Sequence, residues 1–214
     1  MHDFADLWAP GEEQASGIAQ SPFYYYLEKI PLEEYQSAWN SQIRGVAVHM
    51  ISQQERVCGL MRELTPLRDK ISNPTTLQHS IAPALLHDFK VWESAPRLKD
   101  KHPLAKVWAI KSKLKMEQAE FHGYWVSSAI RSKDPAIYGS WYSWKPGAPL
   151  KRLLVVVNIS RTEKPVKLII DWKELGIDPS KVKMTELWTG RELDADALQT
   201  LTIQPHCFAL IGMK

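Results

Sequence analysis

The chain opens with an acid-rich segment whose side chains are suited to acid–base chemistry. Residues 1–21 carry Asp6, Glu12 and Glu13 beside Trp8, and they show no helical or strand periodicity. An irregular segment with carboxylates and an aromatic residue is typical of a functional loop. The same composition is typical of an ordinary chain terminus, which is the commoner explanation. These carboxylates are therefore candidates whose role depends on the elements around them.

Two histidines lie near the ends of predicted elements. His49 comes late in Gly45–Ile51, an apolar run rich in β-branched residues that predicts a strand buried on both faces. The C-terminal ends of such strands carry the active sites of βα barrels. His87 and Asp88 stand at the end of a predicted helix, where they could orient a substrate hydroxyl. A hydrogen-bonded core histidine at His49, and a cap with a surface pair at the second position, are the commoner alternatives.

Helical patterns surround these residues in the first part of the chain. Pro31–Ile43 begins with proline at its first position and continues with apolar residues at helical spacing. A second helix is capped by Asn73, contains Pro83 as a kink and is predicted to run to Trp92. Pro103–Met116 alternates apolar residues with lysines, which predicts an amphipathic helix. Helices next to a buried strand indicate βα units.

The last third of the chain predicts an all-β module. Short apolar runs recur there, and prolines and glycines separate them, which is typical of an antiparallel sandwich. The predicted strands are Ile137–Trp144, Leu153–Ile159, Val166–Trp172, Val182–Trp188, Leu201–Ile203 and Cys207–Ile211. The polar stretch Ser127–Asp134 is interpreted as a linker. The predicted domains are residues 1–130 and 131–214.

Charge and cysteine content exclude several classes of function. The 214-residue chain has a formal net charge of +3 and no dense block of basic residues, so a nucleic-acid partner is not expected. Cys58 and Cys207 lie far apart without a metal-binding pattern, so buried thiols are expected, with a disulfide as the alternative, and no metal or cofactor. No apolar run is long enough to span a membrane, and no signal peptide is evident. The compartment is left undetermined. Nine tryptophans and seven tyrosines permit stacking on sugars without establishing it.

The C-terminal run contains four motifs in a fixed order. They are an apolar strand ending in Asn, an "IIDW" strand with a following "LGI" turn, an "LWTG" strand end and a closing strand introduced by Pro-His. In these motifs the run resembles the β-sandwich appended to (β/α)8-barrel glycoside hydrolases, namely those of the alpha-galactosidase-like clan and uncharacterised proteins near the family 123 glycoside hydrolases. The matching residues are Asn158, Asp171, Trp172, Leu175, Gly176, Leu187, Trp188, Gly190, Pro205 and His206.

This resemblance implies a partial (β/α)8-barrel, or TIM-barrel, segment followed by an all-β C-terminal sandwich. A complete barrel needs roughly 200–250 residues, more than precede the sandwich, so the chain is expected to be the C-terminal portion of a longer glycosidase-like protein or a reduced relative of one. Families of this kind are often secreted or periplasmic. Uncovered strand edges of a partial barrel favour self-association or an upstream barrel half as partner.

The resemblance also assigns roles to the candidate residues. Glycoside hydrolysis requires two carboxyl groups. Asp6 stands where such barrels place the later one, with Glu12 and Glu13 as alternates, and the other is expected upstream. The implied carbohydrate contacts are stacking on Trp8 and hydrogen bonds from hydroxyls to His49, His87 and Asp88. Without an upstream half, the chain is expected to bind sugar weakly and to hydrolyse it poorly or not at all.

Two other classes of function fit the same sequence. A non-catalytic carbohydrate-binding or assembly module predicts aromatic residues gathered on one exposed face and no convergent carboxylates. A structural domain without a ligand predicts that Trp8, Trp92 and Trp125 are all buried.

Overall fold

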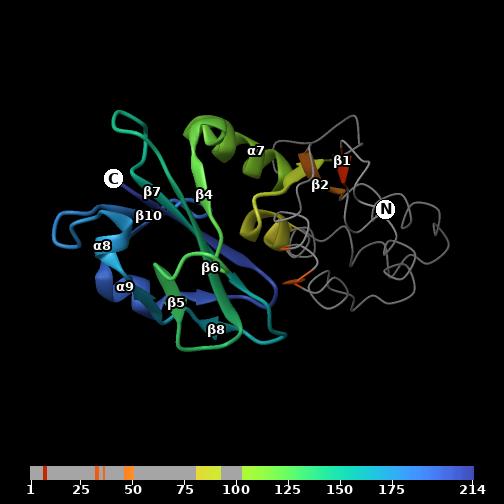
Figure 1. Ribbon diagram of the computed structural model, residues 1–214. Coiled ribbons are helices and arrows are strands. Elements are labelled where there is room, and N and C mark those ends of the chain that lie inside the picture. Colours follow the sequence, from red (N-terminus) through yellow and green to blue (C-terminus); the bar gives the residue numbers. More distant parts are fainter. Residues whose placement is uncertain (1–6, 9–31, 34–35, 37–45, 51–80, 93–102) are drawn as a thin grey trace. The chain divides into compact units, whose positions relative to one another are not determined.

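The computed structural model describes residues 7–8, 32–33, 36, 46–50, 81–92 and 103–214 (Figure 1). The chain divides into two compact units, Met1–Val107 and Trp108–Lys214. The sequence places the domain boundary after residue 130, which lies inside the second of these units.

The N-terminal unit contains a small parallel sheet. Its strands are β1 (Leu7–Trp8), β2 (Val46–Met50) and β3 (Lys90–Trp92), in the order β1-β2-β3. Both strand pairs are parallel. Strand β2 confirms the strand predicted within Gly45–Ile51, and residues 32, 33 and 36 are helical, as predicted for Pro31–Ile43. In the part of the chain that the structure describes the fold is mostly β, and no closed barrel is formed there.

The helix predicted to continue to Trp92 ends earlier, so that prediction was wrong. Residues 81–86 are helical, and the chain then turns into β3. The Phe89 amide donates to the Ala84 carbonyl at 2.8 Å, and Asp88 between them has a φ of 59°. This is the hydrogen bond of a Schellman-type helix end, with Asp88 in the left-handed position that aspartate tolerates better than most residues.

The C-terminal unit is built on one antiparallel sheet of six strands. From edge to edge the strands are β11 (Arg191–Leu193), β10 (Met184–Glu186), β13 (Phe208–Met213), β7 (Arg152–Asn158), β6 (Ile137–Ser143) and β4 (Glu120–His122). Strands β6, β7, β10 and β13 confirm the strands predicted in these places. Helix α7 (Pro103–Leu114) likewise confirms the predicted helix, and a short 3-10 helix, η1 (Met116–Gln118), follows it.

A second layer covers one face of this sheet (Figure 1). It consists of two ribbons, β5 (Ile130–Ser132) with β9 (Leu168–Ile170) and β8 (Lys164–Pro165) with β12 (Thr202–Ile203), and of the helices α8 (Trp172–Leu175) and α9 (Ala195–Thr200). The core between the layers includes Trp141, Leu154 and Ile211. Strand β5 lies inside the stretch Ser127–Asp134, so the interpretation of that stretch as a linker was wrong.

The central strands are buried on both faces, which explains the continuous apolar run of β7. Leu154 and Val156 point into the core between the layers. Leu153 and Val155, which alternate with them, are also buried. Because successive side chains of a strand point to opposite faces, a strand covered on both sides favours apolar residues throughout, as in residues 153–157 of β7.

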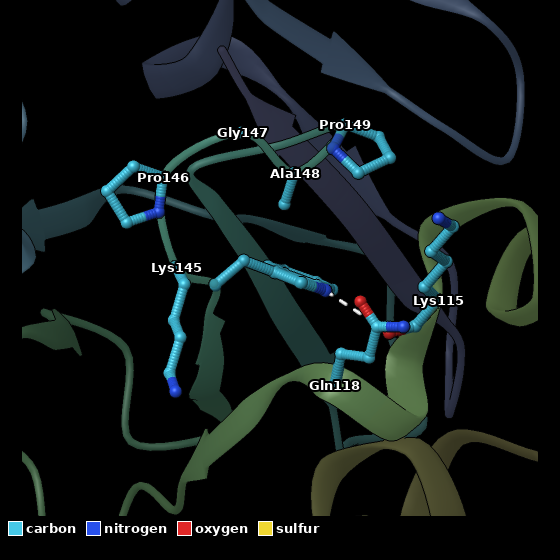
Figure 2. Close-up of a pocket in the computed structure, with 8 residues that line it drawn as sticks. Lys115, Gln118, Lys145, Pro146, Gly147, Ala148 and Pro149 are labelled. Atoms are coloured by element: carbon cyan, nitrogen blue, oxygen red, sulfur yellow. Dashed lines mark hydrogen bonds between the residues drawn. The ribbon is translucent and has the colours of Figure 1, made fainter.

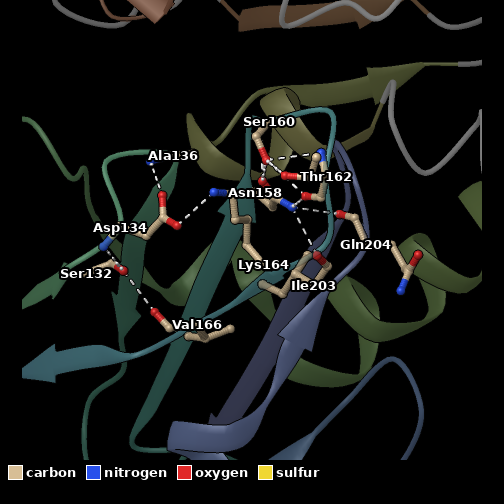
Figure 3. A network of polar contacts seen from close by, with 10 residues as sticks. All are labelled: Ser132, Asp134, Ala136, Asn158, Ser160, Thr162, Lys164, Val166, Ile203 and Gln204. Atoms are coloured by element: carbon tan, nitrogen blue, oxygen red, sulfur yellow. Dashed lines mark hydrogen bonds and ion pairs between the residues drawn. The ribbon is translucent and has the colours of Figure 1, made fainter.

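Asn158 closes the end of β7 and joins three segments of the chain (Figure 3). Its side chain is fully buried. Its amide nitrogen donates to the carbonyls of Thr162, Ile203 and Gln204 at 2.7, 3.0 and 3.2 Å. Its amide oxygen accepts from the Ser160 backbone and hydroxyl at 2.9 and 2.8 Å. One side chain thus satisfies the polar groups of two loops that lie far apart in the sequence.

Helix α8 is short, and capping residues define both of its ends. Asp171 accepts a hydrogen bond from the Glu174 amide at 2.9 Å, and Gly176 ends the helix with a φ of 65°. A capping carboxylate of this kind contributes about 1 kcal/mol. The predicted strand Val166–Trp172 is therefore divided into β9 and the first turn of a helix.

Three further predictions concern the cysteines, membrane-spanning segments and metal ligands. Cys207 is a buried thiol, and burial raises its pKa to about 11, whereas Cys58 lies outside the described part. Within the described ranges, no helix has the length and hydropathy needed to cross a bilayer. Those ranges also hold no group of three side chains that could ligate a metal ion.

Candidate functional site

The predicted catalytic carboxylates, Asp6, Glu12 and Glu13, lie outside the described residues. Their chain positions can still be compared with the strands. Asp6 directly precedes Leu7, the first described residue of β1, and the two glutamates follow Trp8, its last. Their catalytic roles stay predictions.

The parallel sheet brings together the strands that carry two of the predicted sugar contacts. Trp8 is paired with Ala47 of β2, and His49 of β2 is paired with Val91 of β3. His49 therefore lies two positions further than Trp8 towards the C-terminal edge of the sheet, where parallel strands present their functional groups. Contacts of Trp8 and His49 with a sugar stay predictions.

His87 and Asp88 occupy the turn between helical residues 81–86 and β3. The His87 side chain is fully buried, and its Nδ1 lies 2.8 Å from the Pro83 carbonyl oxygen. Because a carbonyl only accepts, Nδ1 carries the proton and donates, which leaves Nε2 as an acceptor in the neutral ring. Burial lowers the pKa of His87 to about 4, so the ring is neutral at pH 7. Asp88 is exposed. The geometry is that of a hydrogen-bonded core histidine, and contact of either residue with substrate stays a prediction.

The neutral state of His87 has a consequence for stability. We expect the free energy of unfolding to fall by about 3 kcal/mol as the pH drops from 6.5 to about 4. The unfolded chain takes up a proton at this histidine from about pH 6.5 downwards, whereas the folded ring stays neutral until about pH 4. The stabilisation is therefore complete above pH 6.5 and is lost across this window.

Urea unfolding at a series of pH values, in wild type and in a His87→Gln variant, measures this contribution. The variant is expected to lose that part of the pH dependence, and the half-exposed control His122→Gln is expected to retain most of it. An unchanged pH dependence in His87→Gln would show that His87 does not carry it.

A polar and aromatic cluster that the sequence analysis missed lies on β4, β6 and β7. The His122 and Trp141 rings are stacked at 3.7 Å between centroids, 10° from parallel. The Arg152 guanidinium lies 5.6 Å from the centroid of Trp141. The indole nitrogen of Trp141 donates to the Ser127 hydroxyl at 2.8 Å, and this hydroxyl donates to Glu174 at 2.8 Å. The cluster fixes the Trp141 ring between the two layers.

His122 is the histidine of this cluster, and its side chain is 26% exposed. Its Nε2 lies 3.0 Å from the Ser143 hydroxyl and 3.9 Å from a Glu120 carboxylate oxygen. Desolvation lowers the pKa of His122; Glu120 opposes this shift, and Arg152 adds to it. The contacts of these residues join β4, β6 and β7 and so stabilise the sandwich. The aromatic density of Glu120–Trp125 was the signal in the sequence, but the partners were unknown without the strand register.

Aromatic side chains of the C-terminal unit do not form an exposed platform. Among the residues whose exposure is described, Trp108 is the one exposed aromatic residue, at 39%. Trp125 is half-buried and contacts Phe121 and Tyr124. The flat aromatic face expected of a sugar-binding module is thus not seen there, and neither is the complete burial expected of a structural domain.

One cavity in this unit combines an indole, prolines and cationic side chains (Figure 2). It has a volume of about 270 Å³ and lies between the α7–η1 turn and the loop that joins β6 to β7. Its lining consists of Lys115, Gln118, Trp144, Lys145, Pro146, Gly147, Ala148 and Pro149. Such a composition can hold a small polar ligand, whereas it offers no carboxylate for acid–base catalysis.

Comparison with known proteins identifies one region of the chain. Residues 103–191 match the family model described as glycoside hydrolase 123, C-terminal domain. The match runs from the first residue of α7 to the first residue of β11, and the central strand β13 lies beyond it. A search of curated proteins finds no match. The chain thus contains a glycoside hydrolase 123 C-terminal domain, which relates it to glycoside hydrolase family 123.

Proposed function

We propose that this chain supplies the C-terminal part of a glycoside hydrolase-like protein. Its parallel-sheet segment belongs to the catalytic barrel, and its sandwich is a non-catalytic domain appended to that barrel. The match of residues 103–191 to a glycoside hydrolase C-terminal domain carries the proposal. The six-stranded antiparallel sheet with its second layer supports it, because that is the architecture expected of the appended module.

The arrangement of β1, β2 and β3 supports the barrel part of the proposal. Consecutive strands of a βα barrel are parallel and adjacent in chain order, and these three strands have both properties. Catalytic residues of such barrels follow the C-terminal ends of strands. Glu12 and Glu13 come after the last described residue of β1, which makes them stronger candidates than Asp6 for that edge.

The proposed chemistry is the hydrolysis of an O-glycosidic bond by two carboxyl groups. One protonates the leaving oxygen, and the other attacks the sugar or activates water. This segment would provide one of them, from Glu12, Glu13 or Asp6, and another strand of the barrel would provide the second. Trp8 would stack on a sugar ring, and His49 would hydrogen-bond to its hydroxyls. The chain alone is then expected to hydrolyse glycosides poorly or not at all.

Substitution of the three carboxylates tests this assignment. Glu12→Gln, Glu13→Gln and Asp6→Asn are made one at a time in the product of the complete reading frame that contains this chain. At least one of them is expected to lower kcat/KM for aryl glycosides by about 1,000-fold, the loss typical of a missing general acid or base. Glu163→Gln, which removes an exposed carboxylate of the sandwich, is the control and should change the rate less than about twofold. Full activity in all three variants would refute the assignment.

A further inference from the structure

The cavity between the α7–η1 turn and the β6–β7 loop is formed by fixed elements. Trp144, one of its lining residues, is 8% exposed, and its indole nitrogen donates to the Lys115 carbonyl at 3.3 Å. The Trp144 amide donates to the Lys151 carbonyl at 3.4 Å across the base of the loop. Pro146 and Pro149 in the wall each have a fixed φ. The cavity therefore exists without a ligand, and binding would not require the loop to become ordered.

Each polar side chain at the rim has a nitrogen that can donate hydrogen bonds to a ligand. Lys115 and Lys145 lie on opposite sides of the cavity, with the Gln118 side chain between them in the view of Figure 2. No carboxylate lines the cavity. Within the described part of the chain, no hydrogen bond or ion pair engages the two ammonium groups or the Gln118 amide, and all three residues are exposed. The rim thus presents two positive charges that a ligand can reach.

Size and surface restrict the ligand further. A volume of about 270 Å³ is just below the range of about 300–1,000 Å³ in which drug-sized ligands are held, so one sugar ring fits better than an oligosaccharide. The apolar residues that line the cavity are Trp144, Pro146, Ala148 and Pro149. Such surface suits the C–H groups of a pyranose, whereas the rim suits an anionic substituent and hydroxyl groups.

We propose that this cavity binds a single acidic sugar unit, a hexuronate or a hexose sulfate, with its anionic group between Lys115 and Lys145 and its ring against Trp144 and the two prolines. The choice of a sugar rests on the proposed function, whereas the requirement for an anionic group rests on the rim. The sandwich would then hold an acidic part of a glycan while the barrel acts on another part.

Proton–nitrogen correlation spectra of the tryptophan indoles in the full chain test this proposal. The Trp144 indole signal is assigned with a Trp144→Phe variant. D-glucuronate, D-glucose 6-sulfate, D-glucose and acetate are titrated to about 50 mM at constant ionic strength. At least one of the two acidic sugars is expected to shift the Trp144 signal saturably, with a Kd of about 1–10 mM, and glucose and acetate are expected to bind about tenfold more weakly. The two acidic sugars distinguish a carboxylate site from a sulfate site.

A double variant and a matched control test whether the shift of the Trp144 signal depends on Lys115 and Lys145 at the rim. Lys115→Gln with Lys145→Gln is expected to weaken the acidic sugar about fivefold or more, whereas Lys133→Gln with Lys173→Gln, two exposed lysines elsewhere, should leave its affinity unchanged. Unshifted signals of the other indoles in the absence of ligand show that each variant is folded. The proposal is overturned if neither acidic sugar binds, if acetate or glucose binds as tightly, or if the control variant loses as much affinity. None of these results depends on glycosidase activity, so they leave the proposed function to its own test.

Discussion

Replacing Asn158 with alanine is expected to lower the free energy of unfolding of the C-terminal unit by about 3–4 kcal/mol. The side chain is fully buried and makes five hydrogen bonds, to Thr162, Ile203, Gln204 and twice to Ser160. Alanine leaves the buried partners among these groups without a donor or acceptor, and each such loss costs about 1–3 kcal/mol where water cannot enter. As Figure 3 shows, the single side chain of Asn158 makes all of these hydrogen bonds.

Hydrogen exchange of the amides in β7 and β13 measures this effect in the full chain, because central strands exchange by unfolding of the unit that contains them. The control is Gln204→Ala. It removes an exposed amide side chain but keeps the backbone carbonyl to which Asn158 donates, so exchange should stay within about 0.5 kcal/mol of wild type. Equal protection in Asn158→Ala and Gln204→Ala would contradict the role given to the network.

A Glu186→Gln substitution is expected to destabilise the same unit by about 2–3 kcal/mol. Glu186 is 4% exposed, and its carboxylate accepts from the Trp188 amide, the Leu210 amide, and the amide and hydroxyl of Thr189 at 3.0, 3.2, 2.7 and 2.6 Å. An ionised carboxylate only accepts, which suits four donors. Glutamine would turn an NH₂ group towards at least one of these donors and lose that bond.

The same exchange experiment, followed at the amides of β10 and β13, tests this prediction. Glu192→Gln in the neighbouring strand β11 is the matched control, because Glu192 is exposed and its carboxylate accepts no hydrogen bond among the described residues. We expect no measurable change in the control. If Glu186→Gln also left hydrogen exchange unchanged, the carboxylate would not stabilise the turn after β10.

The residues that carry the family resemblance perform structural tasks in this chain. Asn158 ties the end of β7 to two loops, and Asp171 and Gly176 cap α8. His206 is buried with a φ of 52° just before β13. Asn158, Asp171 and Gly176 each meet a geometric requirement of the fold, which explains why these positions of the motif are readable in the sequence.

Much of the sandwich could be predicted because its signals are local. The apolar runs of β6, β7 and β13 are long, and prolines or glycines separate them. Strands β4 and β5 were missed because they are short and have few apolar residues. Strand β5 depends on pairing with β9, almost forty residues later, and no local pattern reveals that partner. The end of the helix before β3 was missed because Asp88, and not glycine, takes the left-handed position.

The sequence predicted less about the candidate sites than about the fold. His87 could be singled out as a titratable residue, but its lowered pKa follows from burial, which the sequence does not give. The stack of His122, Trp141 and Arg152 depends on the register of β4, β6 and β7. The cavity of Lys115 and Lys145 forms because two loops meet, and neither loop has a recognisable motif.

Under the proposed function, this chain belongs to a glycosidase whose active site needs a complete barrel. The most direct test of this proposal is kcat/KM on a panel of aryl glycosides, measured for the purified chain and for the product of the complete reading frame that contains it. We expect the complete product to hydrolyse at least one glycoside and the chain alone to be at least about 1,000-fold slower on it. A chain that hydrolyses the glycoside as fast as the complete product, or a complete product inactive on the whole panel, would contradict the proposal.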